Sequence, residues 1–175
     1  RRRLVDYRRV RLDSATHSVE LPERGMKLGL GAIGKGYALD RCAGILAARG
    51  FDDHLLVSGG QILARGTRGG RPWQVGLRDP RGGADEIFAR FELSEGSLST
   101  SADNEQFFEI DGVRYHHILD PRTGWPAKGL RSATVFHLEA TAADALSTAL
   151  LVLGAERGFE VVRAEGGEAL AIDER

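Results

Sequence analysis

Short strands joined by tight turns are the feature that most constrains this fold. The segment from His54 to Gly66 reads HLLVSGGQILARG, which predicts a buried strand, a glycine turn and a partner strand. The segment from Phe107 to Ile118 reads FFEIDGVRYHHI, with Asp111 and Gly112 as a favoured hairpin turn. Strands that pair with their neighbours along the chain form antiparallel sheets. We therefore expect an α+β fold rather than the alternating strand and helix units of a parallel sheet.

Two helical patterns complete the expected fold. Apolar residues recur at helical spacing from Ile33 to Arg49, just before Gly50, and a second pattern from Ala140 to Leu153 ends at Gly154. Further strands are predicted at residues 72–77, 86–93, 132–138 and 168–173. Together these elements predict one domain across residues 1–175, with a mostly antiparallel sheet and its hairpins packed against two main helices.

Composition argues against several classes of partner. The chain has 175 residues, 42% of them apolar, with 24 Lys and Arg against 25 Asp and Glu. It therefore has no excess charge to hold a nucleic acid or an anionic membrane. No apolar run approaches the roughly 20 residues of a membrane-spanning helix. The single cysteine, Cys42, lies in the first helical pattern and is expected to be buried, whereas the basic start of the chain is expected to be an extended edge strand.

The glycine-rich stretch from Gly29 to Asp40 reads GLGAIGKGYALD and matches two nucleotide-binding patterns in part. The dinucleotide fingerprint also needs an acidic residue at the end of the next strand, where this chain has Ser58, Gly59 and Gly60. The alternative that the chain is a nicotinamide-dependent oxidoreductase would therefore rest on the glycines alone. The phosphate-loop pattern needs a Ser or Thr that binds magnesium, and Gly36 occupies that position.

The same stretch still suits a phosphate group. Exposed backbone amides at the start of a helix, with Lys35 beside them, favour a phosphate or pyrophosphate. The alternative is a tight turn that lets the helix pack on a sheet.

A second polar pattern, ADALSTAL, lies in the later helix. It places Asp144 and Thr148 four residues apart on one helical face, where their oxygens can share a hard cation. As an isolated pair, these side chains are better explained by helix capping and by a hydrogen bond to a helix carbonyl.

Five motifs occur in an order that resembles the family of FAD:protein FMN transferases. They are GAIGKGYALD, VSGGQ, LSTSADNEQF, YHHILDPRTGWP and ADALSTAL, and they extend over nearly all of the chain. Core packing does not require residues of these types. The pair formed by HHILDPRTG and ADALSTAL is the most specific part of the resemblance. The resemblance implies an enzyme that attaches FMN to target proteins.

This resemblance implies a metal site and a reaction. In the family, the positions of Asp144 and Thr148 bind magnesium together with a backbone carbonyl at the position of Ala32. The implied reaction is magnesium-dependent transfer of FMN from FAD to a Thr or Ser hydroxyl of a target protein, with release of AMP. Magnesium and Lys35 would neutralise charge on the phosphate oxygens. Because Asp144 would hold this magnesium, it is expected to be catalytic as well as metal-binding.

A catalytic base follows from the same resemblance. His117, rather than its neighbour His116, aligns with the family's motif position. We expect His117 to accept the hydroxyl proton and to contact FAD, with Asp120 as the carboxylate that orients it and as a further FAD contact. A structural hydrogen-bonding role for the histidine is the alternative.

Contacts to the flavin are expected in two other segments. Gly59 and Gly60 would let the backbone approach the flavin or its ribityl chain. Thr100 and Ser101 lie in a loop that resembles the family's flavin-contacting TSG segment. Ordinary turn chemistry is the alternative for both segments.

Departures from the family pattern concern the flavin contacts. The family has Asp at the positions of Gly29 and Gln61, and Gly and Tyr at those of Ala102 and Asn104. Family members also carry an N-terminal portion that precedes the segment matched here. These departures leave a second function open, a module that binds or handles FAD without transferring FMN. The resemblance implies a periplasmic or exported protein, although this chain shows no export signal.

Overall fold

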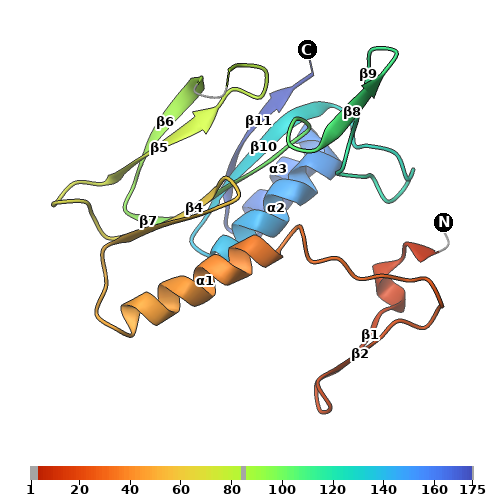
Figure 1. Cartoon of the computed structure of the whole chain (residues 1–175), viewed down its shortest axis with the longest axis horizontal. Coiled ribbons are helices and arrows are strands. Elements are labelled where there is room, and N and C mark those ends of the chain that lie inside the picture. Colours follow the sequence, from red (N-terminus) through yellow and green to blue (C-terminus); the bar gives the residue numbers. More distant parts are fainter. Residues whose placement is uncertain (1–3, 84–85, 175) are drawn as a thin grey trace.

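A five-stranded antiparallel sheet forms the centre of the protein (Figure 1). The computed structural model describes residues 4–83 and 86–174. Each strand is antiparallel to its neighbours, in the order β11 (Glu168–Asp173), β10 (Leu130–His137), β7 (Glu95–Ala102), β4 (Gln61–Arg65) and β3 (His54–Ser58). The α+β class and the antiparallel pairing expected from the sequence are confirmed.

One face of the sheet is covered by helices α1 (Gly34–Ala47), α2 (Ala140–Leu153) and α3 (Ala155–Ala164). Helix α2 lies in the middle against β7 and β10, with α1 on one side of it and α3 on the other. The main core forms where Leu130 and Val135 of β10 meet Leu150 of α2. Burial of this apolar surface holds the helices on the sheet. No helix in the described part of the chain is long and apolar enough to cross a membrane.

Helix α3 is a difference from the sequence prediction, which expects two main helices. Helix α2 ends at Leu153, just before Gly154 as predicted, and the φ of +80° at Gly154 suits glycine. Helix α3 starts at the next residue, and its buried residues Gly158 and Val162 lie about one turn apart. Phe159 and Val161 also pack against the core, so this segment is amphipathic and the sequence prediction overlooked a helix that its pattern indicates.

The other face of the sheet is covered in part by the hairpin of β5 (Trp73–Arg78) and β6 (Ile87–Leu93). Val75 and Leu93 of this hairpin pack against Ala64 of β4 and Leu98 of β7. A second hairpin consists of β8 (Phe107–Ile110) and β9 (Val113–His116). The β8–β9 hairpin predicted from the sequence is confirmed, and the strands predicted at residues 72–77 and 86–93 pair to form the other hairpin.

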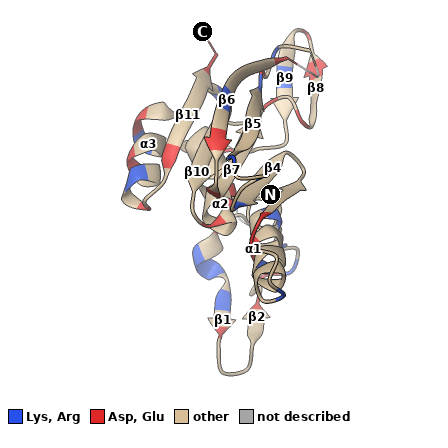
Figure 2. Ribbon diagram, turned by 90° about the vertical axis from the view of Figure 1, so that its left-hand side faces the viewer, with Lys and Arg blue, Asp and Glu red and all other residues tan. Residues whose placement is uncertain are grey.

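The N-terminal segment lies apart from the sheet (Figures 1 and 2). It contains a 3-10 turn, η2 (Tyr7–Arg9), and a hairpin of β1 (Arg11–Asp13) and β2 (Ser18–Glu20). Every residue of the two strands is exposed. The extended conformation expected near the start of the chain is confirmed at β1.

The position of Cys42 corrects a second prediction. Cys42 is exposed, although it was expected to be a buried small residue. The buried face of α1 consists of Gly36, Leu39 and Ala43. Cys42 is one residue from Ala43 and is therefore rotated by roughly 100° around the helix, away from that face.

Candidate functional site

The site is built where the first turns of α1 and α2 cross. A Cβ atom placed on Gly36 would lie 2.1 Å from the carbonyl oxygen of Ala140 and 2.7 Å from the Cα of Thr141. These distances are far below normal contact, so only glycine lets the two helix backbones approach this closely. Close packing therefore explains why a glycine stands where the phosphate-loop pattern has Ser or Thr.

Asp144 of α2 is the buried charge at this crossing. Its side chain is 1% exposed. Oδ1 accepts a hydrogen bond from Lys35 Nζ at 2.7 Å, and Oδ2 accepts one from the backbone N–H of Gly36 at 3.1 Å. The Gly36 amide belongs to the first turn of α1, where backbone donors have no partner within the helix. Asp144 thus caps α1 while the ammonium of Lys35 neutralises its charge.

Asp40 of α1 caps the start of α2 in the same way. Its carboxylate accepts hydrogen bonds from the backbone N–H groups of Ala140 and Thr141, at 2.9 Å and 2.8 Å, and from the Thr141 hydroxyl at 2.5 Å. Glu139, which precedes α2, makes no side-chain cap. The sequence analysis did not predict this role of Asp40. The signal that could have indicated it is the lack of a good N-cap residue before the strong helical pattern of α2, which means that another segment must supply the cap.

Gln61 ties a third segment to the same place. Its Nε2 donates to the carbonyl of Ala140 at 2.7 Å and to the hydroxyl of Ser97 at 3.2 Å. An aspartate, which the family pattern has here, could only accept hydrogen bonds when ionised. The glutamine therefore makes a contact to α2 that the expected carboxylate would not make.

A pocket of about 860 Å³ opens beside this crossing. We call it the central pocket. It brings together most of the site residues predicted from separate segments of the sequence, namely Ala32, Lys35, Gly59, Gly60, Thr100, Ser101, His117 and Thr148. Asp144 does not line the central pocket itself but lies behind Lys35, which does.

Gly59 and Gly60 form the turn between β3 and β4. Their φ angles are +52° and +83°, which is the backbone of a tight hairpin turn that favours glycine at both positions. A Cβ on Gly59 would lie 3.1 Å from Cδ of Lys35. The turn therefore passes directly over the stem of the lysine at the edge of the central pocket.

Thr100 and Ser101 lie in strand β7, and not in a loop as expected from the sequence. Successive residues of a strand point to opposite faces. Ser101 Oγ lies 3.0 Å from the hydroxyls of both Ser147 and Thr148 on α2, whereas Thr100 Oγ1 lies 2.8 Å from Thr134 Oγ1 on β10. Ser101 thereby connects the strand to the hydroxyl predicted to bind metal.

The two neighbouring histidines have different surroundings. His117 is exposed and lines the central pocket. His116 is 7% exposed, and its Nε2 donates to the carbonyl of Ala127 at 2.9 Å. The choice of His117 over His116 as the candidate base agrees with these positions.

The hydrogen bonds of Asp120 do not support its expected role in orienting His117, and its expected contact with FAD stays a prediction. Its carboxylate accepts hydrogen bonds from the backbone N–H and the guanidinium of Arg122, at distances from 2.8 to 3.1 Å. These hydrogen bonds hold the pKa of Asp120 below its ordinary value. Asp120 is not among the described residues that line the central pocket, and no hydrogen bond joins it to His117 there. Its carboxylate fixes the loop after β9 rather than the imidazole.

Hydrogen bonds between polar side chains hold one wall of the central pocket in place, and the sequence analysis did not predict them. Arg81 donates two hydrogen bonds to the carboxylate of Asp103, at 2.7 Å and 2.5 Å. Asn104 Nδ2 donates to the carbonyl of Pro80 at 3.0 Å. The Asp103 carboxylate raises the pKa of Arg81. These contacts fasten the segment after β5 to the end of β7, and both segments line the pocket.

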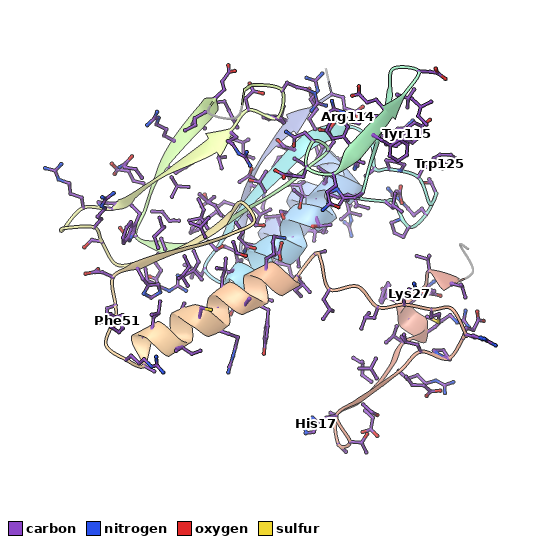
Figure 3. All side chains as sticks on the ribbon, viewed as in Figure 1. His17, Lys27, Phe51, Arg114, Tyr115 and Trp125 are labelled. Carbon is purple, nitrogen blue, oxygen red and sulfur yellow. The ribbon has the colours of Figure 1, made fainter. Side chains whose placement is uncertain are left out.

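Exposed aromatic side chains lie near the β8–β9 hairpin (Figure 3). Tyr115 stacks on Phe108 with ring centroids 5.2 Å apart, and Trp125 lies tilted at 6.2 Å from Tyr115. Trp125 is 63% exposed. These rings lie on β8, on β9 and in the loop after β9, on both sides of His117 in the sequence.

The donors near Asp144 suit a hard divalent cation. Among the described residues, no three His, Cys, Asp or Glu side chains cluster as metal ligands. The ligand set that the family resemblance implies is instead the carboxylate of Asp144, the hydroxyl of Thr148 and the carbonyl of Ala32. All three are oxygen donors, which is the preference of magnesium. Asp144 is also buried against a positive charge already, so its surroundings accommodate a cation.

Comparisons with known proteins show which family and fold this chain is similar to. A sequence model described as the ApbE family matches residues 1–171. A FAD:protein FMN transferase of Treponema pallidum is 40% identical over 173 residues, which cover 90% of this chain and 48% of that protein. One from Escherichia coli K12 is 37% identical over 149 residues, which cover 84% and 42%. The chain thus spans about half the length of these curated relatives.

Two solved structures share the fold closely. The ApbE protein of Thermotoga maritima superposes with a TM-score of 0.89 at 38% identity, over 97% of this chain and 55% of that one. The flavin transferase ApbE of Vibrio cholerae gives a TM-score of 0.86 at 30% identity, over 99% and 55%.

Proposed function

Since the chain belongs to the ApbE family, we propose that it transfers FMN from FAD to a Thr or Ser hydroxyl of a target protein, with magnesium as cofactor and AMP as the leaving product. The observation that carries this proposal is the buried carboxylate of Asp144 behind the central pocket, paired with Lys35. A buried charge with a cationic partner at a cleft is a frequent feature of catalytic sites.

The central pocket offers groups suited to the diphosphate and to the flavin part of FAD. The glycine turn before α1 and Lys35 would bind the diphosphate, because backbone amides at a helix start and an ammonium both favour anions. Gly59 and Gly60 present bare backbone, so a flat ring or a ribityl chain can approach closely. The wall held by Arg81 and Asp103 would limit access of water to the bound nucleotide.

The proposed reaction is a single displacement at phosphorus. The hydroxyl oxygen of the target forms a bond to the phosphorus of the FMN half, and the bond from that phosphorus to the bridging oxygen breaks, so AMP leaves. His117 would accept the hydroxyl proton, and Lys35 would stabilise negative charge on the phosphate oxygens. Asp144, Thr148 and the carbonyl of Ala32 would hold magnesium, which when bound neutralises charge on the diphosphate.

Transfer to a defined acceptor tests the proposal. The purified chain is mixed with FAD, magnesium and the unmodified form of a protein known to carry FMN on a threonine, and covalent flavin fluorescence and AMP are measured. Asp144→Asn keeps the shape of the side chain but removes its charge, and we expect it to lower the transfer rate by at least 10²-fold. Thr148→Val should need more magnesium for half-maximal rate.

Two outcomes would contradict the proposal. Wild-type transfer by Asp144→Asn would mean that this carboxylate holds no essential metal. Tight FAD binding by the wild-type chain without AMP release or labelled acceptor would instead favour the non-transferring FAD module.

A further inference from the structure

We propose that Lys35 is an exchangeable cation that occupies the metal's place on Asp144 and moves into the central pocket when a divalent metal binds. This inference rests on the proposed metal role of Asp144. It adds that the metal and the lysine compete for one carboxylate oxygen, and that the released ammonium becomes the phosphate ligand.

The carboxylate of Asp144 requires a positive charge. Its side chain is 1% exposed, and an isolated carboxylate buried this deeply is strongly unfavourable. Among the described residues, Lys35 is its ion-pair partner, at 2.7 Å from Oδ1. The amide of Gly36 bonds the other oxygen, Oδ2. Oδ1 is therefore the oxygen that one cation holds and that another cation could take.

Lys35 can leave Asp144 without a movement of the helix. Its side chain is 36% exposed, in contrast to the buried carboxylate. The lysine lines the central pocket, and its Cδ lies under the turn at Gly59. Rotation of the last bonds of the stem would carry the ammonium from Oδ1 into the pocket. Lysine is suited to this task because it is a point charge on a flexible chain.

Competition of this kind couples the metal to FAD. A metal that binds alone must displace an ammonium that then has no new anionic partner. When the diphosphate of FAD is present, the displaced ammonium gains such a partner. We therefore expect metal and FAD each to strengthen the binding of the other, a reciprocity that thermodynamic linkage requires.

Direct metal binding without FAD tests the exchange. Manganese serves as the probe, and its binding to the purified chain is measured by electron paramagnetic resonance. Lys35→Met removes the competing charge and keeps most of the stem, so it should bind manganese at least tenfold more tightly than wild type. Lys35→Arg keeps a competing cation and is the matched control, without such a gain.

The results separate this inference from the proposed function. If Asp144→Asn binds manganese as well as wild type does, the metal site itself is wrong, and the exchange falls with it. If Asp144→Asn binds none but Lys35→Met binds no more tightly than wild type, the metal site stands and the exchange is overturned. Absence of binding to both wild type and Lys35→Met would also overturn the exchange.

A second measurement uses the wild-type chain, in case Lys35→Met folds poorly. The chain has three lysines, Lys27, Lys35 and Lys128, of which Lys27 and Lys128 are exposed and serve as internal standards. Acetylation by an amine-reactive ester is followed at each lysine by mass spectrometry. Magnesium should raise the rate at Lys35 severalfold relative to the other two. An unchanged ratio at magnesium concentrations that support full activity would overturn the exchange.

Discussion

Replacement of Gly36 by alanine tests the close approach of α1 and α2. Alanine would place its Cβ 2.1 Å from the carbonyl oxygen of Ala140, where ordinary contact begins at 3.4 Å. The two helix backbones would therefore have to separate by roughly 1 Å, a shift large enough to lose well-packed contacts. The same shift would lengthen the hydrogen bonds that Asp144 and Asp40 make across the crossing.

The expected loss of stability follows from three opposing effects. Alanine in place of glycine favours a helix by about 0.5–1 kcal/mol. Overpacking costs about 1–3 kcal/mol, and a weakened helix cap costs about 0.5–2 kcal/mol. The net effect for Gly36→Ala is therefore a loss of about 2 kcal/mol in the free energy of unfolding. For a chain of this size the melting temperature should fall by roughly 4–8 °C.

Gly44 supplies a matched control on the same helix. A Cβ on Gly44 would have no neighbouring atom within 4 Å, so only the helix preference applies. Gly44→Ala should raise the free energy of unfolding by about 0.5–1 kcal/mol. Urea denaturation of both variants and of wild type measures the two changes. If Gly36→Ala is as stable as Gly44→Ala, the helices do not approach each other as the structure describes.

Three further outcomes are expected. His117→Ala should lower the transfer rate by roughly 10²–10⁴-fold in single-turnover assays, while FAD affinity changes little. His116→Ala should instead lower the melting temperature. Equal effects of the two variants on the transfer rate would contradict the assignment of His117 as the base. Asp40→Asn should cost about 1 kcal/mol in urea denaturation, because a charged acceptor at the start of α2 is lost, and unchanged stability would contradict the cap. The hydrogen bonds from Arg122 lower the pKa of Asp120 from its ordinary 3.8, so their stabilisation is present above that pH and is lost as the pH falls through the lowered value. The stability difference between wild type and Arg122→Met should therefore shrink below about pH 4, and a constant difference down to pH 2 would contradict the pairing.

Local signals explain which elements the sequence could predict. A few neighbouring residues are enough to indicate the hairpin turns at residues 59–60 and 111–112 and the long apolar helix α2. Strand β7 does not, because its sequence EGSLSTSA lacks the alternation of large apolar and polar residues. Its buried Ser97 and Ser99 face partners such as Ser147 of α2, and small hydroxyl side chains fit this narrow space between sheet and helix. The sequence therefore predicts a loop at this strand.

The candidate site was likewise predictable from the sequence only in part. Resemblance to a family located the residues of the central pocket, although they come from segments far apart in the chain. It did not reveal Asp40, because the amides that Asp40 caps lie 100 residues later in the sequence. It also assigned Asp120 to the histidine, since sequence proximity cannot tell which neighbour a carboxylate contacts. Arg122, two residues away, offers a planar pair of donors that a carboxylate binds well.

Asp40 lies nearly two turns inside α1 and Asp144 about one turn inside α2. Each completes the start of the other helix, which has a consequence for how this chain folds. Neither helix start can be fully hydrogen-bonded until both helices have met, although about 100 residues of sheet separate them in the sequence. Such distant contacts delay folding, because a long loop must close before they form. The amides of Gly36, Ala140 and Thr141 should then exchange their hydrogens with solvent in one shared opening event, and not by independent fraying. Any ligand that holds Asp144 in place would slow exchange at the start of α1 as well.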